Sequence, residues 1–166
     1  MLLLNLLRPA VIYPSIYAID LDLLKKSGIK ALIFDLDNTL VEWGSSVARA
    51  ELVAWFKTLQ EKGFRACLLS NNYPPRVQFF ATALGIPAIH RAGKPRRRSF
   101  RAALEILGAA PSETAVIGDQ LFTDVLGGNR LGLHTILVPP LSRREFIGTR
   151  LVRKIEGFLL KHFSKN

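Results

Sequence analysis

The sequence predicts an α/β protein with a doubly wound parallel sheet, a Rossmann-like core covered by helices on both faces. Two observations lead to this prediction: short apolar runs alternate with longer helix-like segments, and each run is apolar throughout rather than at every second position. A strand that is apolar on both sides is buried on both faces, as in parallel sheets flanked by helices. Repeated strand–helix units of this size are typical of the doubly wound class.

Apolar runs supply the predicted strands in order along the chain. The strong runs lie at 30–35, 65–70, 113–119 and 134–139, and a weaker one lies at 87–90. Helices are predicted at about 46–62, 74–84, 96–108, 121–131 and 145–163. The first 28 residues are apolar but interrupted by Pro9 and Pro14. We expect this N-terminal extension to pack against the core, with a peripheral segment that touches a membrane as the alternative.

The length of 166 residues, with no repeat and no low-complexity linker, predicts a single domain over 1–166. Its core is expected at about 29–140, between the extension 1–28 and a basic C-terminal helix. The one cysteine, Cys67, excludes an intrachain disulfide and predicts a buried core residue in a reducing compartment, the cytoplasm or an organelle interior. No run reaches the ~20 apolar residues that span a bilayer.

The net charge of +10 is concentrated in two segments. Residues 91–101 hold six basic and no acidic residues, and residues 142–166 hold seven basic and two acidic ones. This local excess predicts an anionic partner, and phosphates, anionic lipid surfaces and nucleic acids all remain open. The C-terminal helix is amphipathic. We expect its apolar members, among them Ile155 and Phe158, to pack on the sheet, with peripheral contact to an anionic membrane as the alternative.

Three of the four strong runs end in a polar, reactive residue: Asp35, Ser70 and Asp119. The ligands of open α/β sheets bind beyond the carboxyl ends of the strands, so these ends should converge on one site. Neighbouring carboxylates repel each other, and a purely structural sheet gains nothing from placing them there. The pattern therefore predicts a functional site at this edge.

Asp35 and Asp37 stand two positions apart where the chain leaves its strand, and both can face one cavity. Two close carboxylates need a cation, and hard oxygen ligands suit Mg²⁺. Asp119 and Asp124 add carboxylates from another strand end. Taken singly, each signal has a plainer interpretation: an Asx-type turn at Asp37, a helix start after Ser70, or a solvated charge at Lys94.

The combination is more specific than its parts. The order Asp-x-Asp-x-Thr, strand-end Ser, Lys-Pro and Gly-Asp-x-x-x-x-Asp resembles the four motifs of the haloacid dehalogenase (HAD) superfamily, from about Ile29 to Pro140. The stretches "LRPAVIYPSIYAIDLDLLKKSGIKALIFDLDNTLVEW" and "GDQLFTDVLGGNRLGLHTILVPPL" are similar to its subfamily IIIA, the YqeG-type phosphatases. That group includes the mitochondrial-type phosphatidylglycerophosphatases.

The resemblance implies a role for each motif position. Asp35 would be the nucleophile that forms an aspartyl-phosphate, and Asp37 the acid that protonates the leaving oxygen and then activates water. Ser70 would hold the phosphoryl group and Lys94 would neutralise its charge. Asp119 would bind Mg²⁺ with Asp35 and the backbone carbonyl of Asp37. The remaining expected site residues are Asp124, which would support the metal shell or orient Lys94, and Asn38, Thr39, Asn71 and Arg96, which would contact phosphate or substrate.

The intervals between the motifs leave no room for a cap domain. Only "NTLVEWGSS" lies between Asp37 and the next helix, and the interval from Ser70 to Lys94 already has to hold a helix and a strand. We therefore expect an open site that suits a phosphate displayed on something large. Phosphatidylglycerophosphate is the favoured substrate. The alternatives are a phosphatase acting on a protein, a nucleic-acid end or a soluble metabolite, and a basic RNA- or ribosome-associated binding protein with a regulatory site.

Overall fold

A computed structural model gives the structure of the chain and describes residues 2–142 and 147–163. The elements are α1 (Leu2–Leu6), β1 (Val11–Ile12), η1 (Ile16–Ala18), α2 (Leu21–Lys26), β2 (Ala31–Phe34), α3 (Ala50–Glu61), β3 (Arg65–Leu69), α4 (Pro74–Leu84), β4 (Ala88–Ile89), α5 (Arg97–Leu107), η2 (Pro111–Glu113), β5 (Thr114–Gly118), the π-helical turn η3 (Leu121–Val125), α6 (Leu126–Asn129), β6 (His134–Leu137) and α7 (Ile147–Phe163). The five predicted strands and the helices between them are present, with ends shifted by a few residues.

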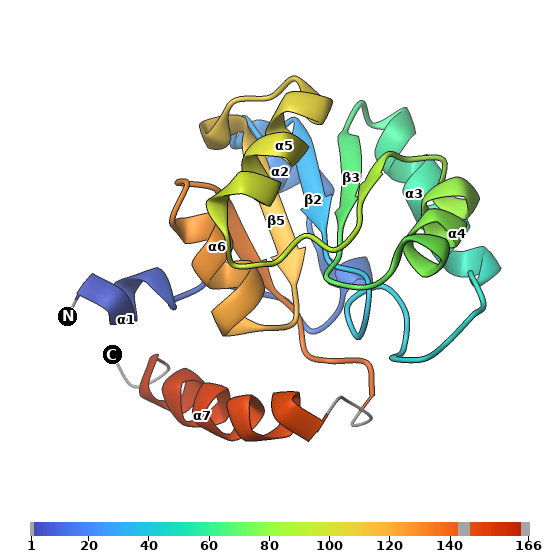
Figure 1. Cartoon of the computed structure of the whole chain (residues 1–166). Coiled ribbons are helices and arrows are strands. Elements are labelled where there is room, and N and C mark those ends of the chain that lie inside the picture. Colours follow the sequence, from blue (N-terminus) through green and yellow to red (C-terminus); the bar gives the residue numbers. More distant parts are fainter. Residues whose placement is uncertain (1, 143–146, 164–166) are drawn as a thin grey trace.

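All pairings in the sheet are parallel, and its order is β1-β6-β5-β2-β3-β4. This arrangement confirms the predicted doubly wound class (Figure 1). Strand β2 lies at the centre, because Ala31 pairs with Arg65 of β3 on one side and with Thr114 of β5 on the other. The carboxyl ends of β3, β2 and β5 are therefore neighbours.

The N-terminal segment does more than pack against the core. Val11 pairs with Ile136, so β1 forms the edge of the sheet, a strand that the sequence analysis did not predict. Helix α2 follows, and the side chain of Asp20 caps it by accepting the N–H of Leu23 at 2.8 Å. The buried Leu24 then fixes α2 on the sheet.

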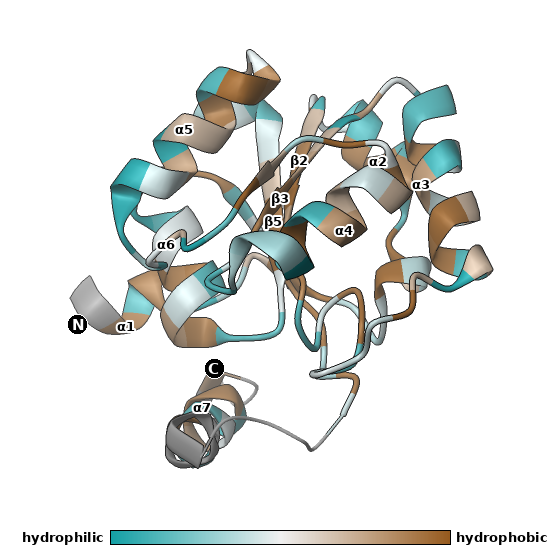
Figure 2. Cartoon of the chain, turned by 45° about the vertical axis from the view of Figure 1, so that its right-hand side comes forward, coloured by the Kyte–Doolittle hydropathy of each residue, from teal (hydrophilic) through white to brown (hydrophobic). Residues whose placement is uncertain are grey.

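Apolar cores lie on both faces of the sheet, as burial of both strand faces requires. On one face Phe34 meets Phe56 and Trp55 of α3, at centroid distances of 5.1 and 5.8 Å. On the other face Ile33 belongs to a cluster that includes Phe100 of α5. Figure 2 shows the hydrophobic strands β2, β3 and β5 between helices with hydrophilic stretches.

Helix α7 lies across the carboxyl end of the strands (Figure 1). Leu159, Leu160 and Phe163 pack against a buried cluster that includes Leu121. The expectation for Ile155 and Phe158 was wrong, because both are exposed, Phe158 by 73%. The face of α7 that packs on the core carries the buried Glu156 and the partly buried Leu160 instead. Two residues of the predicted helix, 145 and 146, lie outside the described residues. Among the described helices, none is long and apolar enough to cross a membrane.

Candidate active site

A pocket of about 590 Å³ opens at the carboxyl ends of β2, β3 and β5. It gathers four residues that the sequence analysis singled out for catalysis. Asp35 and Asp37 follow β2, Ser70 follows β3, and Lys94 lies on the segment between β4 and α5. Its other lining residues are Asn38, Trp43, Asn71, Asn72, Tyr73, Gln120 and Thr123.

Lys94 binds two carboxylates at the floor of this pocket. Its Nζ lies 2.6 Å from Asp35 Oδ1 and 2.7 Å from Asp124 Oδ1, and the lysine is buried. Burial alone would lower the pKa of Lys94, but the carboxylates of Asp124 and Asp35 raise it above its usual value. Burial raises the pKa of Asp35 to about 6, although Lys94 opposes that shift. Lys94 is thus held as a cation against the predicted nucleophile.

The hydroxyl of Thr39 bridges Asp119 and the second carboxylate oxygen of Asp35. The buried Thr39 hydroxyl lies 3.0 Å from Asp35 Oδ2 and 3.1 Å from Asp119 Oδ1. Asp35, Asp119 and Asp124 each offer an oxygen within 4.8 Å of the others. Three hard oxygen donors at this spacing fit a divalent cation such as Mg²⁺.

The segment after β5 that carries Asp119 and Asp124 is closely packed around the Asp124 carboxyl group. The N–H of Gln120 donates to Asp124 Oδ2 at 3.2 Å, so one oxygen holds the loop while the other binds Lys94. A Cβ on Gly118 would lie under 3.0 Å from the Asp124 carboxyl group. Only glycine at this position leaves room for the carboxylate.

Asp37 is held by an arginine that the sequence analysis did not single out. Arg76 of α4 donates to Asp37 Oδ1 from Nε at 3.0 Å and from Nη2 at 2.6 Å, and it also donates to the carbonyl of Ser45. Asn72 Nδ2 donates to Asp37 Oδ2 at 2.9 Å. Both oxygens of Asp37 are therefore oriented by partners on the β3–α4 side of the pocket.

The residues predicted to contact phosphate divide into two groups. Asn38 and Asn71 line the pocket, but Asn38 Oδ1 accepts the Trp43 N–H at 3.2 Å and Asn71 Oδ1 accepts the Lys94 N–H at 2.8 Å. Thr39 and Arg96 do not line it: Thr39 is buried behind Asp35, and Arg96 is exposed where α5 begins. These two residues lie outside the lining of the pocket, and their contact with phosphate or substrate stays a prediction.

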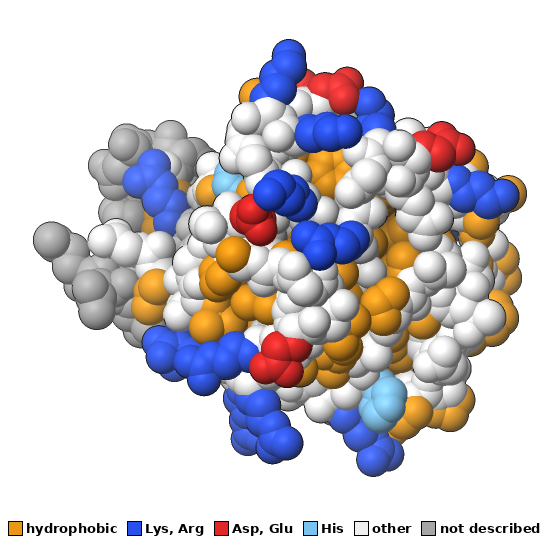
Figure 3. All heavy atoms as spheres, turned by 90° about the horizontal axis from the view of Figure 1, so that it is seen from above, with side chains coloured by type: hydrophobic (Ala, Val, Ile, Leu, Met, Phe, Trp, Pro, Cys, Tyr) orange, Lys and Arg blue, Asp and Glu red, His pale blue; other side chains and the backbone are white. Residues whose placement is uncertain are grey.

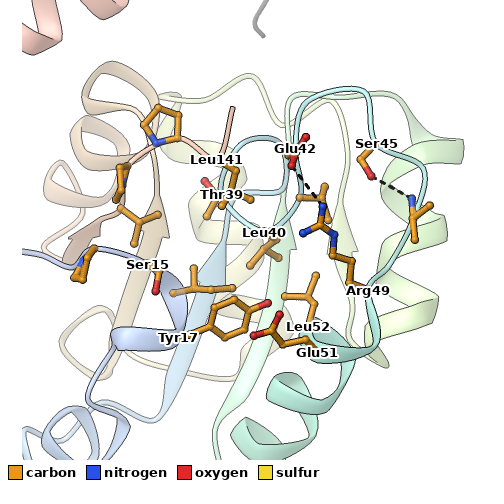
Figure 4. A pocket seen from close by; sticks show the side chains of 17 residues that line it. Ser15, Tyr17, Thr39, Leu40, Glu42, Ser45, Arg49, Glu51, Leu52 and Leu141 are labelled. Atoms are coloured by element: carbon orange, nitrogen blue, oxygen red, sulfur yellow. Dashed lines mark hydrogen bonds and ion pairs between the residues drawn. The ribbon is translucent and has the colours of Figure 1, made fainter. Parts of the chain in front are cut away.

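The loop after β2 also lines a second cavity of about 340 Å³, which Figure 4 shows. Asn38 and Trp43 line the phosphate pocket, whereas Leu40 and Glu42 line the second cavity. Glu42 pairs with Arg49 at 3.5 Å there. The fully described intervals 38–49 and 71–93 hold only this loop, α4 and β4, and neither holds a cap domain.

Known proteins match this chain along most of its length. The family model described as HAD-hydrolase-like matches residues 91–140. A protein of Bacillus subtilis (strain 168) named as probable phosphatase YqeG is 43% identical over 146 residues, which are 88% of this chain and 85% of that protein. The chloroplastic phosphatidylglycerophosphate phosphatase 1 of Chlamydomonas reinhardtii is 33% identical over 93% of this chain; the aligned part is 61% of that longer protein.

A solved structure agrees on the fold. The cobalt-bound deoxy-D-mannose-octulosonate 8-phosphate phosphatase YrbI of Haemophilus influenzae superposes with a TM-score of 0.54 at 16% identity, over 82% of this chain and 90% of that one. The parallel sheet and the YqeG match, which spans most of both chains, lead to one conclusion. The chain belongs to the HAD family and is one of its phosphatases.

Proposed function

We propose that the chain is a Mg²⁺-dependent phosphatase that works through a phosphoenzyme on Asp35 and acts on phosphatidylglycerophosphate. The observation that carries the chemistry is the short contact of Lys94 Nζ with Asp35 Oδ1, at 2.6 Å in a pocket that also contains Asp37 and Ser70. Phosphoryl transfer is catalysed mainly by positioning and charge stabilisation, and these residues supply both.

Asp35, Asp119 and Asp124 form the candidate metal site, and the first two are the favoured ligands. Both oxygens of Asp124 have partners, Lys94 and the N–H of Gln120, whereas Asp35 Oδ2 and Asp119 Oδ1 meet at the Thr39 hydroxyl. When bound, Mg²⁺ offsets the negative charge of these carboxylates and of the phosphoryl oxygens.

In the first step an oxygen of Asp35 attacks phosphorus, and the bond from phosphorus to the leaving oxygen breaks. Asp37, in its protonated form, gives its proton to that oxygen. Lys94 stabilises the charge on Asp35 and on the transferred group, and the Ser70 hydroxyl donates to a phosphoryl oxygen. Ser70 Oγ already accepts the N–H of Asn72 at 3.1 Å, which orients the hydroxyl.

In the second step Asp37 takes a proton from a water molecule that attacks the phosphorus of the aspartyl-phosphate. The bond from phosphorus to Asp35 breaks, inorganic phosphate leaves, and both carboxyl groups return to their starting states. A covalent carboxylate intermediate divides one difficult displacement into two easier ones.

Phosphatidylglycerophosphate is proposed as the substrate because two relatives are named for this activity. They are the Chlamydomonas protein and its counterpart from Arabidopsis thaliana, 31% identical over 93% of this chain and 47% of that protein. The pocket supports the proposal, since no cap encloses it within the described intervals between the motifs. A phosphate carried by a lipid headgroup can enter such a pocket without leaving the membrane.

The test is phosphate release from phosphatidylglycerophosphate in detergent micelles, compared with soluble phosphomonoesters that include a ribonucleoside monophosphate. We expect Mg²⁺-dependent release with preference for the lipid, and none from Asp35→Asn. A preference for the soluble esters would reject the substrate, and turnover by Asp35→Asn would reject the phosphoenzyme.

A further inference from the structure

Two large aromatic side chains stand exposed at the mouth of the phosphate pocket. Trp43, on the loop after β2, is 46% exposed, and Tyr73, which precedes α4, is 66% exposed. Both also line the pocket. Exposed rings at this place are not needed for packing the core, and Trp and Tyr are enriched where a surface is apolar on one side and wet on the other.

Hydrogen bonds from the backbone N–H groups of Trp43 and Tyr73 to neighbouring asparagine side chains hold both residues in place. The N–H of Trp43 donates to Asn38 Oδ1 at 3.2 Å, and the N–H of Tyr73 donates to Asn72 Oδ1 at 2.7 Å. The carbonyl of Asn38 accepts the N–H of Leu141 at 3.0 Å, and Leu141 is half exposed. Asn38 thus holds both Trp43 and Leu141, although Leu141 lines the second cavity and lies beside the phosphate pocket rather than in its lining.

A cation belongs to the same group of residues. The N–H of Arg91 donates to the carbonyl of Asn72 at 3.0 Å, and its guanidinium carbon lies 5.3 Å from the centre of the Tyr73 ring. Arg91 is exposed. We call Trp43, Tyr73, Leu141 and Arg91 the pocket rim.

The composition of the pocket rim favours a bilayer over a nucleic acid as its partner. Arg91 already lies over the Tyr73 ring, where a base would stack, and Leu141 offers a base no flat surface. Trp, Tyr and an aliphatic side chain are suited to the boundary between headgroups and acyl chains. An arginine near an anionic leaflet adds attraction of ~1 kcal/mol.

Charged and apolar side chains are also exposed on other faces of the molecule. Figure 3 shows the end of the molecule opposite the carboxyl ends of the strands, where Lys and Arg side chains are interspersed with Asp and Glu. Helix α7 also has exposed apolar side chains, Ile155 and Phe158, beside the exposed Lys154. Neither surface lines the phosphate pocket, so neither by itself would bring a lipid phosphate to Asp35.

We propose that the pocket rim docks on the surface of an anionic bilayer and presents the pocket directly to phosphate groups of lipid headgroups. This inference rests on the proposed lipid substrate and deepens it, because it names the surface that meets the membrane. The rings enter the headgroup region, and Arg91 pairs with a lipid phosphate beside the pocket.

Tryptophan fluorescence tests the docking without turnover. The chain has two tryptophans, and Trp55→Phe leaves Trp43 as the single reporter while keeping a ring against Phe34. In the Asp35→Asn, Trp55→Phe protein, we expect Trp43 emission to shift to the blue with vesicles of phosphatidylcholine and phosphatidylglycerol. Vesicles of phosphatidylcholine alone should have little effect.

Co-sedimentation with the same vesicles tests each rim residue in the otherwise unchanged chain. Arg91→Gln should weaken binding about fivefold, the equivalent of ~1 kcal/mol. Trp43→Ala with Tyr73→Ala should weaken it further. The matched control is Ile106→Ala on α5, because Ile106 is equally half exposed but does not line the pocket.

Any of three results would overturn the inference. The first is a Trp43 emission that vesicles do not shift. The second is vesicle binding that is lost in Phe158→Ala and kept in the rim variants, and the third is a Trp43 change with an RNA oligonucleotide but not with vesicles. Failure of the proposed substrate is distinguishable. Vesicle docking without hydrolysis of phosphatidylglycerophosphate rejects the substrate alone, whereas hydrolysis in micelles without vesicle docking rejects the rim alone.

Discussion

Lys94 contacts Asp35 and Asp124 at once, and this pairing determines the electrostatics of the site. Because the lysine and both acids are largely removed from water, their charges are compensated mainly by one another. The raised pKa of Asp35 shows that burial outweighs the help from Lys94. Ionisation of the buried Asp35 therefore has an energetic cost at neutral pH.

That cost predicts a pH-dependent effect of Asp35→Asn. The folded pKa of Asp35, about 6, lies above the ordinary value of 3.8 for this group, so folding favours the protonated acid. Wild-type stability from this group is present below pH ~4 and is lost as pH rises through about 6. In EDTA, the advantage of Asp35→Asn in unfolding free energy should grow over that window, by roughly 3 kcal/mol at most. Urea titrations at several pH values measure it, and a constant difference would contradict the burial argument.

Arg76 should matter for turnover through Asp37. Arg76→Gln removes the two-pronged contact at 3.0 and 2.6 Å and lets the Asp37 carboxyl group rotate. We expect kcat on a soluble phosphomonoester to fall ~10-fold or more, with a small change in KM, because proton transfer depends on this orientation. Arg101→Gln, an exposed arginine on α5, is the control. A rise in KM alone would assign Arg76 to substrate binding instead.

The sequence located those site residues that stand at strand ends, since the convergence of parallel strands follows from the fold class alone. Asp35, Ser70 and Asp119 are of this kind. Arg76 could not be found in this way. Its partner Asp37 is 39 positions away, and only the packing of α4 against α3 and β4 brings the two together. The contact of the Thr39 hydroxyl with both Asp35 and Asp119 was likewise not predictable, because the turn after β2 sets that geometry.

At the scale of the elements, α6 packs so closely that its glycines leave no space for a side chain. A Cβ on Gly127 would lie under 3.0 Å from the ring of Phe100, and one on Gly128 would meet Val116 and Thr135 equally closely. Phe100 is fully buried in α5, and the close approach of α5 and α6 therefore depends on Gly127.

Two glycine-to-alanine changes should have opposite effects on stability. Gly127→Ala forces Phe100 from its place and should cost ~1–3 kcal/mol. Gly157→Ala on α7 meets nothing within 4 Å and replaces a poor helix former, so it should add ~0.5–1 kcal/mol. Urea denaturation followed by circular dichroism measures both. Equal effects would show that helix propensity, and not packing, decides.

Elements with continuous apolar runs were predictable, and those without them were not. Strands β2, β3, β5 and β6 are buried on both faces and therefore show uninterrupted apolar letters. Strand β1 has only two residues between Pro9 and Pro14, too few to produce any pattern, and its pairing with β6 depends on the whole sheet. The partners of α7 likewise decide which of its apolar side chains are buried.

At the scale of the whole molecule, three close carboxylates should make the stability of the fold depend on divalent cations. Asp35, Asp119 and Asp124 lie within 4.8 Å of one another through their oxygens. Mg²⁺ that binds only the folded chain should raise Tm progressively with its concentration, following RT ln(1 + [Mg²⁺]/Kd). Asp119→Asn should reduce this shift strongly. Differential scanning fluorimetry measures it, and an equal shift in both proteins would place the cation elsewhere.

The burial of the single cysteine makes the folded chain unreactive toward thiol reagents. Cys67 is enclosed in β3, and burial raises the pKa of its thiol to about 12, so almost no thiolate exists at neutral pH. A cysteine introduced on the surface, as in Phe158→Cys or Leu141→Cys, would then be the one position that a maleimide or nitroxide label modifies. The native sequence thus already provides the unlabelled background that spin-label depth measurements at a bilayer require.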